Sequence, residues 1–268
     1  MNDIAELLRL APVQRGFAAT LIAGAGLPIA GVWILGLEVV PLRFAMMHVA
    51  LLGVALGALL GIEPLLVALA LCALSGAALA PLAARPEGLA GPLGLLMTLS
   101  IALALLVLSI AGVNATRAFE WLWGSVLATQ PADIVALAVV VALLAAFELR
   151  FHRSLKLLLH DRELALCSGV PVAALTVGLL VLMSVAVAAS IKLTGALLVD
   201  AVTLLPALAA RNLGQSFDGI LAWAVGIGAV GAVSGFFLTL WSDQPPGPVL
   251  ILTMTAITLA SYVVRGKR

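Results

Sequence analysis

Long apolar runs, separated by short polar breaks, extend along almost the whole chain. Most runs hold about 20 residues, the length that an α-helix needs to cross the hydrocarbon core of a bilayer. Glycine, proline and charged positions mark the breaks. The pattern predicts spans at residues 16–36, 42–60, 64–84, 92–113, 133–149, 172–191, 195–212, 217–240 and 247–264. The second run is short and rich in glycine, which leaves a full crossing there open. We therefore expect an all-α, polytopic bundle of about eight or nine transmembrane helices.

The composition supports the same class of protein. Of 268 residues, 63% are hydrophobic and 10% are charged, whereas soluble domains hold about 45–50% apolar and about 25% charged residues. A net charge of +1 without a basic cluster gives no reason to expect nucleic acid as a partner, and membrane lipid is the expected surrounding. We expect residues 1–15, which mix apolar and charged positions, to form an interfacial N-terminal segment. Residues 16–268 are then a single transmembrane domain.

Lysine and arginine are distributed unevenly between the two sides of this predicted bundle. If the C-terminus is cytoplasmic, the residues on that side are Arg43, Arg85, Arg150, Arg153, Lys156, Arg162, Arg211, Arg265, Lys267 and Arg268. The other side holds only Arg9, Arg15, Arg117 and Lys192. Because positive residues concentrate in cytoplasmic loops, the N-terminus is expected outside and the long polar interruption at 148–171 inside. In that interruption we expect Glu148 to reach water at a span end, and His152 and His160 to be solvated loop side chains.

Two polar residues inside the predicted spans are candidates for chemistry. A charge at the bilayer centre costs about 2.5–3.5 kcal/mol on insertion scales, so Asp200 is a functional candidate by default. The alternative is a buried ion pair, for instance with Arg43 or Lys192. His48 is either an imidazole that hydrogen-bonds across helices or a metal ligand on a permeation path, since imidazole and carboxylate together suit zinc and related divalent ions.

Other side chains add little to this pair. Met46 and Met47 flank His48 and are weaker candidates for the pathway, because methionine also fills gaps between helices. Thr203 is a possible pathway residue on the span that holds Asp200. Cys72 and Cys167 form no metal or redox motif.

Enzyme signatures are absent from the sequence. There is no G-x-S-x-G or H-E-x-x-H pattern, and none of the three lysines lies in a phosphate-binding G-x-x-x-x-G-K-[ST] loop. We therefore expect a transport subunit and not an enzyme. If ATP drives this protein, another chain binds it.

Three stretches resemble a known family. "HVALLGVALGALLGI" at 48–62 is similar to the second span of the ABC-transporter permeases that import zinc, manganese or iron. The stretch from 160 to 213 resembles their coupling segment and following helices, and "SDQPPGPVLIL" at 242–252 resembles their last extracellular turn. The resemblance implies a homodimer in the bacterial cytoplasmic membrane, with its pathway at the dimer interface. It also implies an ABC ATPase subunit and an extracytoplasmic solute-binding protein as partners, and a divalent metal ion, zinc first, as substrate without a permanently bound cofactor.

The same resemblance implies that the part of the polar interruption at 150–171 is a cytoplasmic coupling loop. Its matching residues are Asp161, Arg162, Glu163, Leu164, Gly169 and Val170. In such permeases this region docks on the ATPase. We expect a short helix that is charged at its start and ends at Gly169 and Pro171, and the alternative is an ordinary basic loop.

One departure from the family is specific. Its members typically read Gly-Asp-x-x-x-His before the histidine, whereas this chain has Arg43 and Phe44 in the first two positions. We hypothesise that Asp200 supplies the lost carboxylate from another helix. The predicted spans leave roughly 10 Å of depth between His48 and Asp200 at 1.5 Å per residue, so two successive stations are the alternative to one site.

Two other functions stay open. The pathway could carry a metal chelate such as a siderophore, or the chain could be a membrane enzyme or structural subunit without a transport role. Co-purification with an ATPase would separate the last of these from the others.

Overall fold

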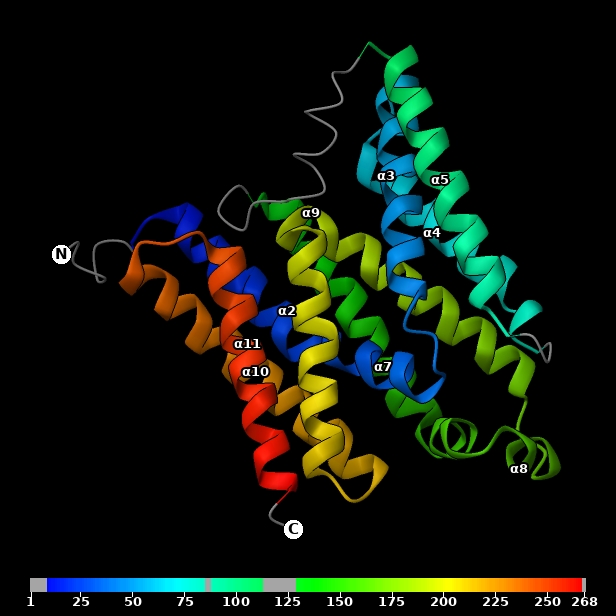
Figure 1. Cartoon of the computed structure of the whole chain (residues 1–268). Helices are drawn as coiled ribbons and strands as arrows, with labels where there is room; N and C mark the ends of the chain where they lie inside the picture. The colour runs from blue at the N-terminus through cyan, green and yellow to red at the C-terminus, as the bar shows by residue number, and fades with distance from the viewer. Residues whose placement is uncertain (1–8, 85–87, 113–128, 267–268) are drawn as a thin grey trace.

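The computed structural model describes residues 9–84, 88–112 and 129–266, and this part of the chain is helical without a β-strand. Its helices are α2 (Ala11–Gly36), α3 (Leu42–Leu60), α4 (Pro64–Leu79), the 3₁₀ turn η1 (Leu82–Ala84), α5 (Ala90–Ile110), α7 (Pro131–His160), α8 (Arg162–Cys167), α9 (Val172–Leu213), α10 (Phe217–Ser242) and α11 (Pro246–Arg265). Figure 1 shows them as one bundle, with α3, α4 and α5 grouped together on one side. The predicted N-terminal segment falls partly outside the described residues, and its residues 11–15 begin α2.

Within the described residues, seven helical segments are long and apolar enough to cross a membrane. They are α2, α3, α5, α7, the part of α9 at Val172–Ile191, α10 and α11, and α4 is a shorter apolar helix of 16 residues. Large apolar side chains remain exposed on this bundle, among them Leu149 at 80%, Trp241 at 75% and Leu95 at 72%. Such a surface suits lipid and not water. The prediction of an all-α polytopic membrane protein is confirmed.

The spans predicted at 172–191 and 195–212 belong to a single helix, α9, of 42 residues. A straight helix of that length would measure about 63 Å, twice the roughly 30 Å of a hydrocarbon core. Figure 1 shows instead two limbs that meet in a sharp bend beside the α9 label. The first limb packs on α4, where a Cβ on Gly76 would lie 2.7 Å from the Leu180 carbonyl oxygen. The second packs on α11, where Thr258 donates a hydrogen bond of 3.1 Å to the Leu205 carbonyl.

The polar interruption at 150–171 is largely helical, which corrects the expectation of a loop. α7 continues to His160, eleven residues past the predicted end of its span, and α8 follows at once. The reason is that residues 150–160 keep a helical apolar face, with Leu155 0% and Leu158 4% exposed. Hydropathy finds where an apolar run ends, and an amphipathic helix can extend beyond that point.

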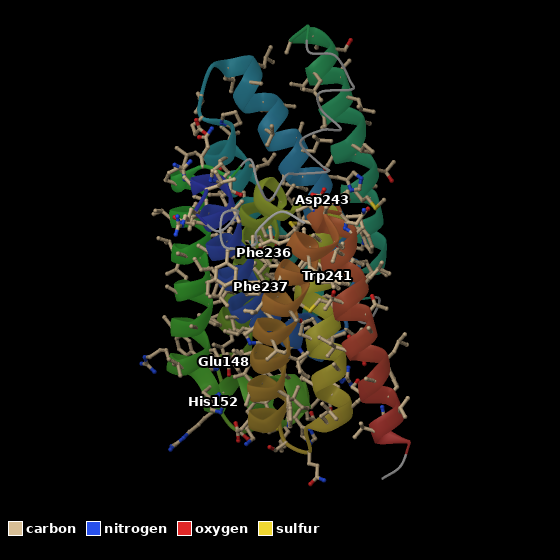
Figure 2. The ribbon with its side chains drawn as sticks, turned by 90° about the vertical axis from the view of Figure 1, so that its left-hand side faces the viewer. Glu148, His152, Phe236, Phe237, Trp241 and Asp243 are labelled. Carbon is tan, nitrogen blue, oxygen red and sulfur yellow. The ribbon has the colours of Figure 1, made fainter. Side chains whose placement is uncertain are left out.

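The two ends of the bundle differ in chemistry. In Figure 1 the C-terminus, the α9–α10 turn and α8 lie toward the lower edge, away from the N-terminus. Figure 2 shows Glu148 and His152 toward this lower end, while Trp241 and Asp243 lie toward the opposite end of α10. There Phe17 of α2 packs against Phe236 and Phe237, at ring-centroid distances of 5.3 and 5.9 Å. The basic turns of α7 and α8 are therefore on the same side as the C-terminus, as the sequence predicts.

Candidate functional site

His48 lies within α3 and its side chain is 8% exposed. Its Nδ1 is 2.6 Å from the carbonyl oxygen of Phe44, one turn earlier. Because a carbonyl only accepts, Nδ1 carries the proton and donates it, and Nε2 is left with its lone pair. This is the arrangement in which a second hydrogen bond orients a metal-binding imidazole.

Asp200, on the second limb of α9, forms an ion pair with Arg43 at the start of α3. The Arg43 side chain is 5% exposed and that of Asp200 is 29% exposed. The guanidinium carbon also lies 5.1 Å from the centre of the Phe44 ring. The sequence left open a buried pair with Arg43 or Lys192, and the structure shows the pair with Arg43.

His48 and Asp200 are not joined by a hydrogen bond or ion pair in the described part of the chain. Arg43 precedes His48 by five residues, which corresponds to about 7.5 Å along the helix and about 140° around it. The Arg43 and His48 backbone positions therefore lie on different faces of α3. Each of the two side chains has its own partner, the Phe44 carbonyl for His48 and the Arg43 guanidinium for Asp200.

The weaker pathway candidates lie inside the bundle. Met46 is fully buried, and its carbonyl oxygen is 3.5 Å from the Cys72 sulfur, which donates to it. Met47 is half-buried. Thr203 is 2% exposed, and its carbonyl oxygen faces Gly31 of α2 so closely that a Cβ there would lie 2.0 Å away. The Thr203 hydroxyl lacks a hydrogen-bond partner among the described residues.

Across residues 9–84, 88–112 and 129–266, no group of three histidine, cysteine, aspartate or glutamate side chains is placed to hold a metal ion together.

The short helix predicted before Gly169 is present as α8. Asp161 caps its start, with a carboxylate oxygen that accepts a hydrogen bond of 2.9 Å from the Leu164 amide. Gly169 ends the turn with φ of +74°, a conformation that glycine adopts without a steric penalty. The Val170 amide then donates to the Ala165 carbonyl at 3.1 Å.

α8 is fixed to the bundle on one side and open on the other. Ala165 is buried, and Arg162 donates to the Ala83 carbonyl at 3.1 Å, beside a pocket of about 480 Å³. That pocket lies between the α2–α3 turn, the start of α5 and the α7–α8 corner. Glu163 and Leu164 face outward, and Leu164 is 49% exposed. An exposed apolar side chain among charges at the basic end of the bundle can form a contact with another protein.

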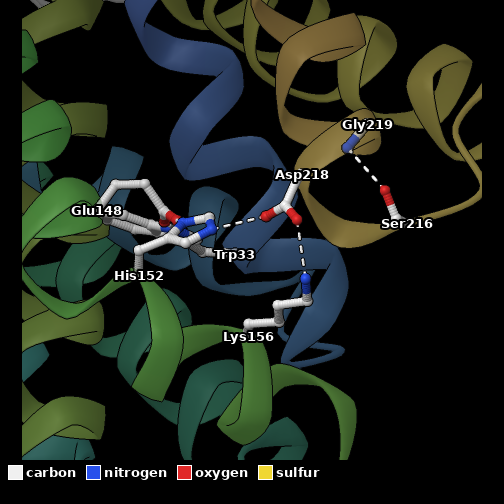
Figure 3. A network of polar contacts seen from close by, with 7 residues as sticks. All are labelled: Trp33, Glu148, His152, Lys156, Ser216, Asp218 and Gly219. Carbon is white, nitrogen blue, oxygen red and sulfur yellow. Dashed lines mark hydrogen bonds and ion pairs between the residues drawn. The ribbon is translucent and has the colours of Figure 1, made fainter.

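A polar network that the sequence did not reveal joins α2, α7 and α10 (Figure 3). Glu148 is 2% exposed and accepts hydrogen bonds from Trp33 Nε1 at 2.6 Å and from His152 Nδ1 at 2.7 Å. The other ring nitrogen of His152 is 2.6 Å from an Asp218 oxygen, and Lys156 donates to the second Asp218 oxygen at 2.8 Å. The expectations that Glu148 reaches water and that His152 is a solvated loop side chain are therefore wrong.

The network also sets the charge state of His152, which lies beyond the apolar part of α7. Both ring nitrogens face carboxylate oxygens, so both donate only when the ring is protonated. The hydrogen bond to Glu148 raises the pKa of His152, partial burial opposes this, and Asp218 raises it further. The i, i+4 spacing of Glu148, His152 and Lys156 was the available signal, and it was hidden because this segment was predicted to be a loop.

Known proteins resemble this chain over most of its length. The model of the ABC 3 transport family matches residues 10–265. A probable metal transport system membrane protein of Thermotoga maritima is 26% identical over 206 residues, which cover 76% of this chain and 73% of that protein. The high-affinity zinc uptake system membrane protein ZnuB of Haemophilus influenzae is 23% identical over 221 residues, 82% of this chain and 85% of that protein.

A solved structure shows the same fold. One chain of PsaBC from Streptococcus pneumoniae, determined in complex with Fab, superimposes with a TM-score of 0.82 at 23% identity. The alignment covers 97% of this chain and 94% of that one.

Proposed function

Because the chain belongs to the ABC 3 transport family, we propose that it is the membrane-spanning permease subunit of an ATP-driven importer for divalent metal ions. Zinc is the first candidate, and manganese and iron are the others. The match over residues 10–265 carries this proposal, and the zinc uptake protein similar to 82% of the chain supports the choice of ion. ATP hydrolysis belongs to a separate ATPase chain, and a solute-binding protein delivers the ion from outside.

In this proposal the ion meets two stations in turn. His48 offers the Nε2 lone pair of a ring whose orientation its Nδ1 hydrogen bond fixes. Asp200 offers a carboxylate whose side chain is 29% exposed in the single chain. Nitrogen and oxygen ligands of this kind suit zinc and manganese, and few ligands allow both selection and release. A homodimer with its pathway along the shared interface would bring two copies of each station together.

The coupling role falls to α8. Its open surface, with Glu163 and Leu164, would sit on the ATPase, while Arg162 and the buried Ala165 tie it to the transmembrane helices. ATP binding that moves the ATPase would then shift α8 together with α7 and α9, between which it lies in the chain.

The test is uptake of radioactive zinc and manganese into vesicles that contain the permease, its ATPase and its binding protein. We expect His48→Ala to lower uptake at least about tenfold, because it removes the proposed nitrogen ligand. Leu52→Ala, one turn later on α3 and half-buried, truncates a nearby side chain without removing a ligand and is the matched control. Co-purification of the ATPase verifies assembly.

If wild type takes up neither free ion but does take up a metal chelate, the substrate is a chelate and not a free metal ion. Equal uptake by wild type and His48→Ala would remove His48 from the pathway.

A further inference from the structure

The ion pair between Arg43 and Asp200 combines two charges within membrane-spanning helices. Arg43 is 5% exposed, and removing one member of such a pair leaves an uncompensated charge in a medium that solvates it poorly. Asp200 is more open, at 29%. A small cation that reaches the pathway can therefore contact this carboxylate, whereas the guanidinium opposite is shielded.

Arg43 is held by few contacts. Asp200 is its only ion-pair partner among the described residues, and the guanidinium Nε has no hydrogen-bond partner there. The Phe44 ring, 5.1 Å from the guanidinium carbon, provides a second favourable surface through a cation–π contact. The guanidinium can thus leave the carboxylate and stay close to an aromatic face, without being released into lipid.

We propose that Arg43 is a tethered counter-ion, an inference that rests on the proposed function. Arg43 pairs with the Asp200 carboxylate when no substrate ion is present, and it competes with the ion for that carboxylate. The competition makes Arg43 a residue that determines specificity. A sodium or potassium ion carries the same charge as the guanidinium and gains nothing by replacing it. A divalent ion carries twice the charge, so its attraction to the carboxylate at equal distance is doubled.

Equilibrium binding of the metal alone tests this proposal. The full chain, reconstituted in lipid nanodiscs, is dialysed against radioactive zinc or manganese in the presence of excess sodium. The variants are Arg43→Gln, Asp200→Asn and the double variant. Arg15→Gln, which removes an exposed arginine at the start of α2, is the matched control for loss of one positive charge.

We expect Arg43→Gln to bind the divalent ion at least about tenfold more tightly than wild type, because its competitor is gone. Asp200→Asn should bind at least about tenfold more weakly, and the double variant should resemble Asp200→Asn. Arg15→Gln should resemble wild type. Sodium should weaken divalent binding more in Arg43→Gln than in wild type, because the open carboxylate then admits monovalent ions.

If the Arg43–Asp200 ion pair has only a structural role, the binding measurements give a different result. If Arg43→Gln binds like wild type or more weakly while Asp200→Asn loses affinity, Asp200 is a station and the competition is wrong. If wild type binds the ion and neither variant changes its affinity, Asp200 takes no part in binding and this proposal fails, whereas wild-type uptake of zinc and manganese still tests the proposed function.

Arg43→Gln can fail to fold because it leaves Asp200 unpaired. In that case the Arg43→Lys variant tests the competition, because lysine keeps the charge but lacks the planar guanidinium that pairs best with a carboxylate. A folded Arg43→Lys that binds the divalent ion several-fold more tightly than wild type supports the competition. Affinity equal to or below that of wild type overturns it.

Discussion

Several polar side chains inside this bundle have polar partners, and some of these partners come from distant parts of the chain. Glu148 is buried because Trp33, 115 positions away, and His152 both reach its carboxylate. Asp200 is tolerated on α9 because Arg43 of α3 meets it. The sequence identified Asp200 and His48 as unusual, since polar groups in apolar runs are rare. It gave two possible partners for Asp200 and none for Glu148, because Trp33 lies 115 positions away and leaves no local spacing pattern, while the i, i+4 spacing to His152 fell in a segment predicted to be a loop.

His152 leads to a prediction about pH. Its pKa is raised above 6.5 in the folded protein, chiefly by the hydrogen bond to Glu148 and also by Asp218. A raised folded-state pKa stabilises the protein fully below the unfolded value near 6.5, and this contribution is lost as pH rises through the raised pKa. Lys156, which pairs with Asp218, and the Phe217 ring, 5.7 Å from the imidazole, complete its surroundings.

We therefore expect the thermal midpoint of wild type to exceed that of His152→Gln by a few degrees at about pH 6, and the difference to shrink at about pH 9. Tryptophan fluorescence during heating in detergent measures both proteins at each pH. A difference that stays constant with pH would show that His152 acts only through packing and neutral hydrogen bonds.

At the scale of elements, hydropathy located the apolar segments well and their junctions poorly. The starts and ends of α3, α10 and α11 lie close to the predicted spans. The junction between the limbs of α9 was expected as a break between two spans, yet the helical backbone continues through it. The α7 helix also continues past its predicted end, because charged residues on one face hid an apolar face on the other. The short α8 was expected from its charged start and its glycine, and its capping confirms the local rule.

The cap of α8 gives a prediction about coupling. Asp161→Ala removes the side-chain acceptor for the Leu164 amide, a change that costs about 0.5–2 kcal/mol at a helix N-cap. In a helix of six residues this loosens the whole element. We expect ATP-dependent uptake to fall several-fold while metal binding by the permease alone stays unchanged. Asp161→Asn is the matched control, because asparagine caps equally well and so should keep most of the uptake.

Uptake assays and equilibrium dialysis, run in parallel, separate ATP-dependent transport from metal binding. If Asp161→Asn loses as much uptake as Asp161→Ala, the charge of Asp161 and not the helix cap is needed. If both variants transport like wild type, α8 does not couple through its N-terminus.

The whole molecule depends on close approach of helices where side chains are smallest. α2 and α10 meet at Gly24 and Gly228, where a Cβ on Gly228 would lie 2.1 Å from the Gly24 carbonyl oxygen. In lipid, helices associate through such packing and not through the hydrophobic effect, because lipid tails are as apolar as the side chains. Glycine-rich stretches in the sequence indicate helix packing in general. They do not say which helix a glycine faces, so the pairing of α2 with α10 came only from the structure.

Gly228→Val should therefore push α2 and α10 apart, because backbone atoms at 2.1 Å cannot give way as a flexible side chain could. We expect a loss of stability of about 1–3 kcal/mol from overpacking, seen as a lower thermal midpoint. The α10 end of the polar network moves with that helix, so the pH dependence attributed to His152 should weaken in the same variant. Gly226→Val, two positions earlier on α10, meets no atom within 4 Å and adds the same side chain facing open space. If the two variants melt alike, valine harms α10 through its helix propensity alone, and the close contact with α2 contributes nothing to holding the bundle together.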